Sequence, residues 1–157
     1  MANRDRLHIT IPMLLSLSVS GITFVGADVG GFFGNPDNEM VTRWYQMAAY
    51  QPFFRGHAHH DSKRREPWLF DDVTNSIVRE QLRMRYTLLP LWYTLFYENE
   101  IDAQPPMRPI WWDFPEDTEA FGLDDIHLLG DTLLVRPVLE QGATSVSIYF
   151  PGKSTVW

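Results

Sequence analysis

The chain has 157 residues, which suits one domain, or the end of one domain joined to the start of another. Its 45% apolar content is that of a globular core and excludes a wholly disordered chain. The formal net charge of −7 argues against a nucleic-acid-binding protein, and the absence of cysteine excludes both disulfides and cysteine-based metal sites.

The first predicted element is a helix over about residues 5–20, which Gly21 ends. The apolar residues 22–25 then predict a short strand buried on both faces. Because two arginines precede a long stretch without charged residues, this region also has the outline of a signal peptide. Pro12 and Gly21 interrupt that stretch and hydroxyl side chains dilute it. We therefore predict a buried helix and a buried strand, and no membrane span.

A glycine-rich segment at residues 26–31 follows the predicted strand. Glycine lets the backbone approach a ligand closely. Asp28 stands at the C-terminal end of the strand, where barrel enzymes place working side chains. The same carboxylate could instead cap a turn, and the pattern favours neither role. A helix over residues 38–50 is expected next, with Asn38 as its N-cap, and a second apolar run follows at residues 51–55.

The second apolar run leads into a histidine-rich segment, His57-Ala58-His59-His60-Asp61. Two histidines separated by one residue can hold a metal ion together with a further ligand. A neutral histidine can also donate a hydrogen bond to a ligand hydroxyl without any metal. The pattern favours hydroxyl recognition, and a metal site formed by His57, His59 and Asp61 remains the alternative. The basic run at residues 63–65 is expected to be a solvated loop.

A long helix is predicted over residues 72–97, with a kink at Pro90. Its apolar residues recur at three- and four-residue steps, so they are expected to share one face: Leu82, Tyr86, Leu89, Tyr93 and Phe96. Further strands are predicted at residues 132–138 and 145–150, with turns at Gly142 and at residues 151–152. Helices alternating with buried strands, followed by strands alone, predict the end of a parallel barrel or sheet running into an all-β module.

Several motifs, taken together, resemble glycoside hydrolase family 31, and in particular its glucosidase II and neutral α-glucosidase branch. They are Gly-Ala-Asp-Val-Gly-Gly-Phe-Phe-Gly-Asn-Pro at residues 26–36, Arg-Trp-Tyr-Gln-Met-Ala-Ala-Tyr-Gln-Pro-Phe-Phe-Arg-Gly-His at 43–57, Arg-Arg-Glu-Pro-Trp at 64–68, Arg-Tyr at 85–86, Leu-Leu-Pro at 88–90 and Met-Arg-Pro at 107–109. Their order and spacing also fit that family.

The resemblance implies an α/β fold in which the C-terminal part of a (β/α)8 TIM barrel is followed by the beginning of an all-β sandwich module. We expect residues 1–104 to be the last barrel units, 105–125 a connecting segment, and 126–157 the start of the proximal β-sandwich domain. The family's nucleophile lies in Trp-x-Asp-Met-Asn-Glu and its acid/base in Trp-Thr-Gly-Asp-Asn, and neither string occurs here. The chain is therefore expected to begin just past the acid/base aspartate, and to carry no catalytic residue.

The resemblance also implies roles for four residues. Phe32 and His57 match positions that line the pocket for a terminal glucose, and His57 is expected to be buried there. Asp28 and Arg55 match neighbouring positions and are expected to support them as a pair. No cofactor or metal is implied.

The implied activity is retaining hydrolysis of terminal α-linked glucose from oligosaccharides or N-glycans. The expected partners are the α-glucoside substrate and, for a glucosidase II-like protein, a regulatory β-subunit. Nucleic acid is not expected as a partner. The expected compartment is the endoplasmic reticulum lumen for a glucosidase II-like protein and the cytoplasm otherwise. Two rival functions remain, a non-catalytic carbohydrate-binding or structural protein and a metal-dependent barrel hydrolase.

Overall fold

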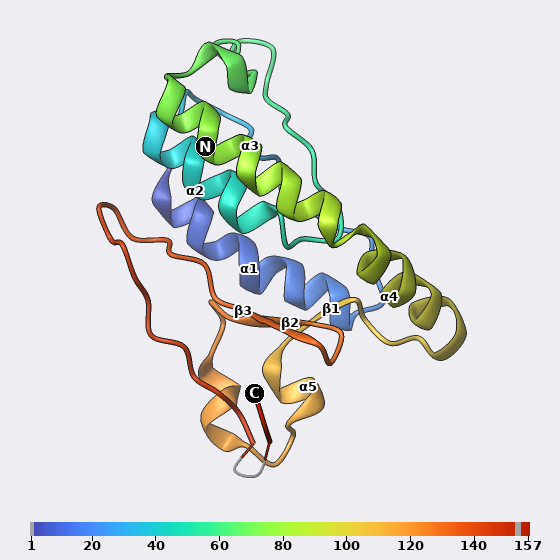
Figure 1. Cartoon of the computed structure of the whole chain (residues 1–157). Coiled ribbons are helices and arrows are strands. Elements are labelled where there is room, and N and C mark those ends of the chain that lie inside the picture. Colours follow the sequence, from blue (N-terminus) through green and yellow to red (C-terminus); the bar gives the residue numbers. More distant parts are fainter. Residues whose placement is uncertain (1, 153–154) are drawn as a thin grey trace.

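The computed structural model describes residues 2–152 and 155–157 and consists mainly of helices, with one small sheet (Figure 1). The α-helices are α1 (Arg4–Val19), α2 (Asn38–Ala48), α3 (Asp72–Thr87), α4 (Leu89–Asp102) and α5 (Ile110–Asp113). Two 3-10 turns are η1 (Pro67–Leu69) and η2 (Thr118–Gly122), and the strands are β1 (Met107–Arg108), β2 (His127–Leu129) and β3 (Leu133–Val135). In the described residues, no helix is long and apolar enough to cross a membrane.

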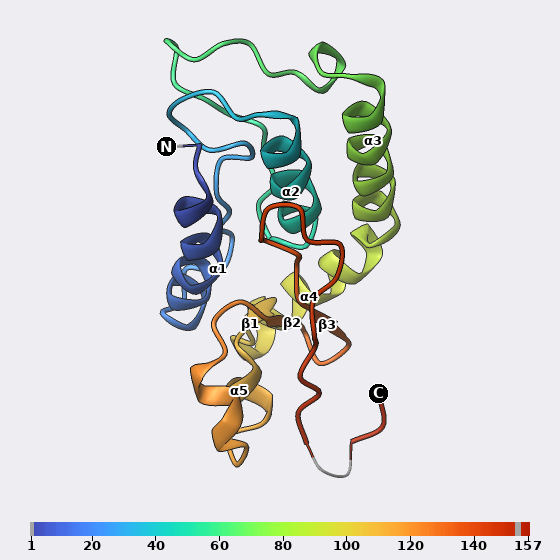
Figure 2. The same ribbon diagram turned by 90° about the vertical axis from the view of Figure 1, so that its left-hand side faces the viewer.

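The helices α1, α2 and α3 lie side by side as one layer, which is clearest when the molecule is turned (Figure 2). The predicted first helix is confirmed as α1, where the side chain of Asn3 accepts a hydrogen bond from the Arg6 amide at 3.0 Å and so caps the first turn. Leu7, Ile11 and Leu14 recur on one face of α1 and are almost completely buried.

The second helix is also confirmed, with a corrected start and end. Asp37, and not the predicted Asn38, is the N-cap of α2, because its carboxylate accepts from the Met40 amide at 2.7 Å. The helix ends at Ala48, two residues before the predicted end.

The predicted long helix is two helices, α3 and α4, which meet at Leu88. Pro90 lies in the first turn of α4, a position where its missing amide hydrogen costs nothing. The shared apolar face is wrong as a prediction. Tyr86 is 71% and Tyr93 82% exposed, so neither lies on a buried face. The buried residues of α4 are instead Trp92 and Leu95.

The small sheet is antiparallel and has the order β1-β2-β3, with Met107 opposite Leu129 and Leu129 opposite Leu133. It lies against the end of α1, where the Ser18 hydroxyl donates to the Met107 carbonyl at 2.5 Å. The predicted strand at residues 132–138 is confirmed as the shorter β3, whereas β1 and β2 were not predicted.

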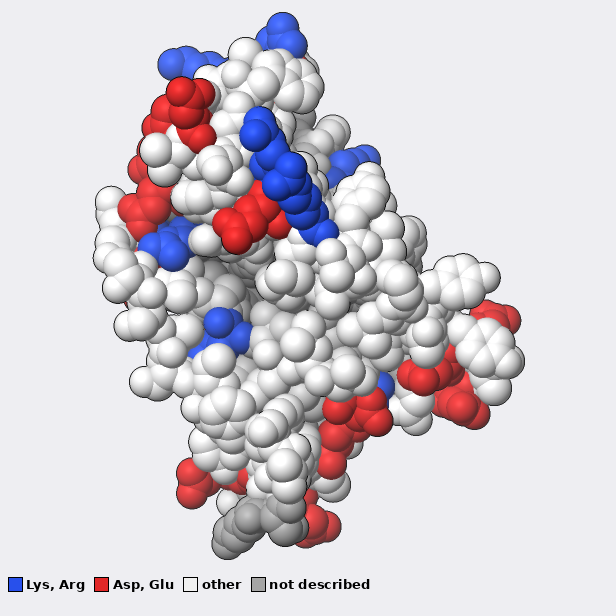
Figure 3. Space-filling view, in the orientation of Figure 1, with Lys and Arg blue, Asp and Glu red and all other residues white. Residues whose placement is uncertain are grey.

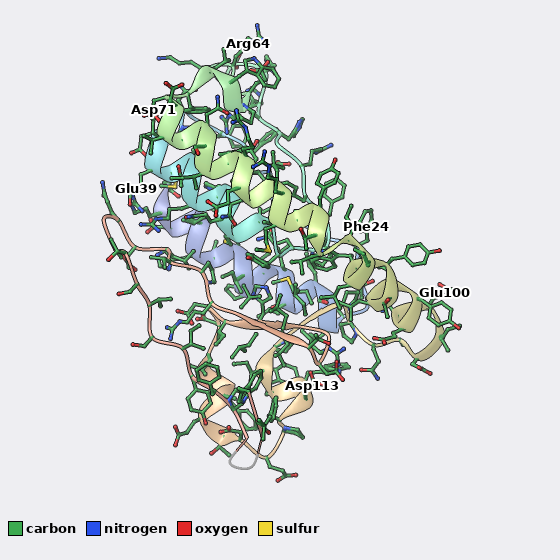
Figure 4. All side chains as sticks on the ribbon, viewed as in Figure 1. Phe24, Glu39, Arg64, Asp71, Glu100 and Asp113 are labelled. Atoms are coloured by element: carbon green, nitrogen blue, oxygen red, sulfur yellow. The ribbon has the colours of Figure 1, made fainter. Side chains whose placement is uncertain are left out.

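Two strand predictions are wrong. Residues 145–150 form no strand, and residues 22–25 form none either, with a bend at Phe24. Ile22 is 56% and Phe24 65% exposed, so residues 22–25 are not buried on both faces as predicted. Phe24 lies beside α4 (Figure 4), with its ring 5.5 Å from that of Phe96. Among the described residues 22–25, Val25 accepts a backbone hydrogen bond from the Phe53 amide, and no ladder of paired residues is formed there.

Candidate functional site

Two segments, residues 22–29 and 52–56, run parallel to each other where they pair. The Phe53 amide donates to the Val25 carbonyl at 2.9 Å, and the Val29 amide donates to the Arg55 carbonyl at 3.0 Å. Val29 and Gly56 form a parallel bridge. Gly26 permits the approach, because a Cβ there would lie 1.8 Å from the Phe53 carbonyl oxygen. The loops that follow the two segments, residues 30–34 and 57–61, therefore leave the pair at the same end.

The first loop is held by an arginine. The Arg65 guanidinium donates to the carbonyls of Gly30 at 2.9 Å and of Gly34 at 2.6 Å, and also to the Gly31 carbonyl. All three glycines have positive φ, between 79° and 91°, which a residue with a side chain rarely adopts. Burial lowers the pKa of Arg65 below its ordinary value. The solvated-loop prediction is therefore wrong for Arg65.

The same prediction is right for the neighbouring arginine. Arg64 projects from the top of the molecule (Figure 4), with a side chain 75% exposed, and pairs with Glu66 at 2.6 Å. In Figure 3 the upper half of the molecule carries both basic and acidic side chains, so its surface is mixed in charge.

Phe32, in the first loop, and His57, at the start of the second, lie close together. Their ring centroids are 5.6 Å apart and their planes are inclined by 31°. His57 is exposed, contrary to its expected burial, and Phe32 is partly buried. The rings are close enough to present one wall to a small ligand. The sugar-binding roles of these two residues remain predictions.

Asp28 and Arg55 form an ion pair beside this wall. The Arg55 Nη2 atom lies 3.5 Å from Asp28 Oδ1, and the side chains are 54% and 29% exposed, respectively. The Arg55 guanidinium also lies 5.6 Å from the ring centroid of Phe53. An exposed pair of this length contributes little stability. Its evident effect is to join the carboxyl ends of the two parallel segments.

Two adjoining hollows divide the predicted site residues between them. A cavity of about 480 Å³ is lined by His57, Arg65 and Tyr45 among others. A second hollow of about 300 Å³ is lined by Asp28 and Phe32 together with residues of α1. Burial raises the pKa of Tyr45 above its ordinary value. The Tyr45 hydroxyl thus stays protonated near neutral pH and is a possible hydrogen-bond donor in the first cavity.

The histidine-rich loop contains a group of possible metal ligands that differs from the predicted one. His59, His60 and Asp61 offer ligand atoms that all lie within 4.8 Å of one another. His57 is not part of this group, because its ring faces Phe32. The metal alternative with His57, His59 and Asp61 therefore does not match the grouping of the described side chains.

Sequence reasoning missed Arg65 and also Arg85. The Arg85 guanidinium donates to the carbonyls of Ala49 at 3.1 Å and Pro52 at 2.8 Å, and to that of Gln51, and it lies 4.6 Å from the Trp92 ring centroid. Burial lowers the pKa of Arg85 to about 10. This arginine holds the turn that leads into the second parallel segment. The only local signal was its place in the Arg-Tyr motif.

A polar and aromatic wall at the carboxyl ends of parallel segments is the arrangement of an α/β enzyme that binds its ligand at that end. The family profile described as "Glycosyl hydrolases family 31 TIM-barrel domain" matches residues 1–95, and "Glycosyl hydrolase family 31 C-terminal domain" matches residues 103–157. The chain belongs to glycoside hydrolase family 31, which confirms the resemblance seen in its motifs.

Individual relatives agree. The chain is 54% identical over 158 residues to neutral alpha-glucosidase AB of Dictyostelium discoideum and 53% identical over 156 residues to neutral alpha-glucosidase C of Homo sapiens. Each match covers 99% of this chain and 17% of the relative, so the chain spans about one sixth of the length of these proteins.

Solved structures give the same result. A glucosidase II alpha subunit with Glc1Man2 bound superposes with a TM-score of 0.94 at 45% identity, over 96% of this chain and 16% of that one. The family 31 alpha-glucosidase from Bacteroides thetaiotaomicron superposes with a TM-score of 0.82 at 37% identity, over 88% of this chain and 24% of that one. The predicted α/β family fold is thus confirmed in its coarse form.

Proposed function

We propose that this chain forms one wall of the sugar pocket of a retaining α-glucosidase, where Phe32 and His57 contact a terminal α-linked glucose. The supporting observation is the 5.6 Å approach of the two rings from loops that follow neighbouring parallel segments. An imidazole N–H can donate to a sugar hydroxyl, and an aromatic face suits the C–H groups of a pyranose ring. Asp28 and Arg55 support the wall by linking the two segments.

Positioning is the contribution of this wall to the reaction. A retaining glycosidase uses two carboxyl groups about 5–5.5 Å apart, one as nucleophile and one as acid/base. The family's strings for both groups are missing from this sequence. The wall would hold the glucose ring so that its anomeric carbon faces carboxylates supplied outside these residues, which lowers the barrier by fixing the reacting geometry.

The division of the chain follows from the same proposal. Residues 1–104 would be the last units of the (β/α)8 barrel, residues 105–125 a connection, and residues 126–157 the start of the β-sandwich module. The parallel pairing of residues 22–29 with 52–56 supports the first part, and the antiparallel sheet supports the last. The strand β1 joins that sheet from within the connection.

We further propose a glucose-terminated oligosaccharide, such as an N-glycan, as the substrate class. Solved relatives are described as bound to Glc1Man2 and to alpha3-Glc2. Another is described as an endoplasmic-reticulum heterodimer of a catalytic subunit with the binding domain of a regulatory subunit. By this likeness we place the activity in the endoplasmic reticulum lumen, with a regulatory β-subunit as partner.

The test is a chimera in which residues 1–157 replace the matching segment of human neutral alpha-glucosidase C. We expect the 157-residue chain alone to release no glucose from a nitrophenyl α-glucoside, because it lacks both carboxyl groups. We expect the chimera to keep kcat/KM within about tenfold of its parent, or about 1.4 kcal/mol in barrier height. Turnover by the chain alone, or a folded chimera without turnover, would contradict the proposal. Glucose binding by such an inactive chimera would favour the non-catalytic rival.

A further inference from the structure

The histidine-rich loop places three side chains with metal-binding chemistry around one point. His59 Nδ1 lies 3.5 Å from Asp61 Oδ2, and His60 Nε2 lies 3.3 Å from Asp61 Oδ1. The side chains of His60 and Asp61 are 81% and 79% exposed, so an ion can reach them directly from solvent. His59 is 29% exposed and forms the inner side of the group.

The two nitrogen-to-oxygen separations are close to those of ligands around a small dication, and all three ligand atoms lie within 4.8 Å of one another. Zinc binds imidazole nitrogen at about 2.0–2.1 Å and carboxylate oxygen at about 2.0–2.2 Å, usually in tetrahedral geometry. Two ligand atoms at such distances and at a tetrahedral angle are about 3.4 Å apart. The two nitrogen-to-oxygen distances of 3.5 and 3.3 Å lie on either side of that value.

Hydrogen bonding at His59 adds a second argument. The Asp61 amide donates to His59 Nδ1 at 3.3 Å, so this nitrogen accepts and carries no proton in the neutral ring. The single lone pair of Nδ1 is used in this bond, and a metal ion bound there would replace the Asp61 amide as its partner. The Asp61 carboxylate lies 3.5 Å from the same nitrogen and would share the ion with it.

The loop backbone is held in place before any ion binds. The His59 amide donates to the Phe32 carbonyl at 2.8 Å, and the Ser62 amide donates to the His59 carbonyl at 2.9 Å. On the far side of the group, the Lys63 amide donates to the Asn35 side chain at 2.8 Å. Little loop ordering would therefore remain to oppose ion binding.

We propose that His59, His60 and Asp61 bind one divalent transition-metal ion, of the Zn²⁺, Ni²⁺ or Cu²⁺ class, at the rim of the Phe32–His57 wall. Two imidazoles and one carboxylate favour these ions over Mg²⁺ and Ca²⁺, which prefer oxygen ligands. Water completes the coordination, because the group offers three side chains and faces solvent. The ion has no part in the hydrolytic reaction.

An ion bound at this site would affect the Phe32–His57 wall, because His59 contacts Phe32. The ring of His59 lies 5.6 Å from that of Phe32 and 5.2 Å from that of Phe33, and its amide is bonded to Phe32. The rings of His59 and His60 are already 4.0 Å apart, so any adjustment that an ion imposes on His59 is passed to Phe32 through these contacts. Given the proposed function, we therefore expect the ion to weaken glucose binding and to act as an inhibitor.

The first experiment measures binding by the full chain, without a histidine tag and stripped of metal. Isothermal titration with Zn²⁺ should give one site per chain, and Mg²⁺ should give none. Replacing one ligand, as in His60→Ala or Asp61→Asn, should weaken Zn²⁺ binding by at least about 10- to 100-fold. The matched control is His8→Ala, because His8 faces Glu140 at 3.3 Å and lies outside the group. Zn²⁺ binding that His60→Ala leaves unchanged would overturn the proposal, as would the absence of binding.

The second experiment uses the active chimera and separates this inference from the proposed function. Zn²⁺ should raise KM for the chimera and should have little effect on its His60→Ala variant. Equal inhibition of both would contradict the link to the wall. An inactive chimera would contradict the proposed function, while the titration of the full chain would still decide whether the metal site exists.

Discussion

The region where α1 and α2 meet the small sheet differs from the Phe32–His57 wall in what holds it together. Leu7, Met47 and Leu129 are completely buried in the first region. In the second, His57 and Arg55 are exposed and the contacts are mainly hydrogen bonds to loop carbonyls. Apolar burial supplies most of the stability of a fold, whereas ligand-binding groups are placed on loops that a rigid scaffold supports. The comparison predicts that stability and recognition can be changed separately.

The largest expected effect on stability comes from the buried region. Leu129→Ala removes a completely buried side chain between Met107 and Leu133, and should lower the free energy of unfolding by about 2–5 kcal/mol. The matched control is Leu69→Ala, because Leu69 is 52% exposed and should change it by less than about 0.5 kcal/mol. Urea denaturation of both variants measures the difference, and equal losses would contradict the comparison.

The next largest expected effect is a loss of stability in acid, caused by the completely buried His127. Desolvation lowers the pKa of His127 to about 4, although a hydrogen bond to the Tyr50 carbonyl at 3.4 Å favours the proton. The unfolded chain takes up this proton below about pH 6.5, but the folded chain does not, so stability present above pH 6.5 is lost as pH falls toward 4. The loss should reach about 3 kcal/mol near pH 4.

His127→Gln removes that titrating group and should flatten stability between pH 6.5 and 4.5. Two carboxyl groups that accept backbone hydrogen bonds, Glu39 and Asp71, have lowered pKa values and lose their contribution at more acidic pH. Urea midpoints measured in half-unit steps of pH separate the two effects. An unchanged slope in the variant would show that His127 is not the acid-sensitive group.

A smaller loss of stability is expected from a change at Arg85, which lies between the two regions. Arg85→Lys keeps the charge but cannot reach the carbonyls of Ala49, Gln51 and Pro52 with one planar group. Leaving one or two of these carbonyls unpaired should lower the free energy of unfolding by about 1–3 kcal/mol. Arg83→Lys, on the exposed face of α3, is the control and should have almost no effect. A similar result for both would mean that Arg85 does not anchor this turn.

The sequence predicts an element of this fold well when the residues that determine the element lie close together in the chain. The helix α1 and most of α2 follow from apolar periodicity and caps that lie within a few residues. A kink at Pro90 was predicted, but the division into two helices at Leu88 and the exposure of Tyr86 and Tyr93 were not. The buried face of a helix depends on the neighbour that it meets in the fold.

The strand errors have a different cause. Residues 22–25 and 145–150 have strand-like composition, but a strand also needs a hydrogen-bonding partner that no local window contains. Arg65 shows the same limit at the site. Its place in a basic run predicts solvent exposure, and its actual partners, Gly30 and Gly34, lie more than thirty residues away in the chain. By contrast, the motif match placed Phe32 beside His57, and Asp28 beside Arg55, as the structure has them.

The most direct test of the central claim is the kinetics of His57→Ala in the chimera, measured with and without chelator. If His57 holds the glucose ring, kcat/KM should fall about 10- to 1000-fold, or about 1.4–4 kcal/mol, and kcat should fall together with the rise in KM. His60→Ala should be much milder under the same conditions, and the melting temperatures of both should stay near that of the unmodified chimera. Joint failure of His57→Ala and His59→Ala, with activity abolished by chelator, would favour the metal-dependent rival. A folded His57→Ala chimera with unchanged kinetics would contradict the assignment of this residue to the sugar pocket.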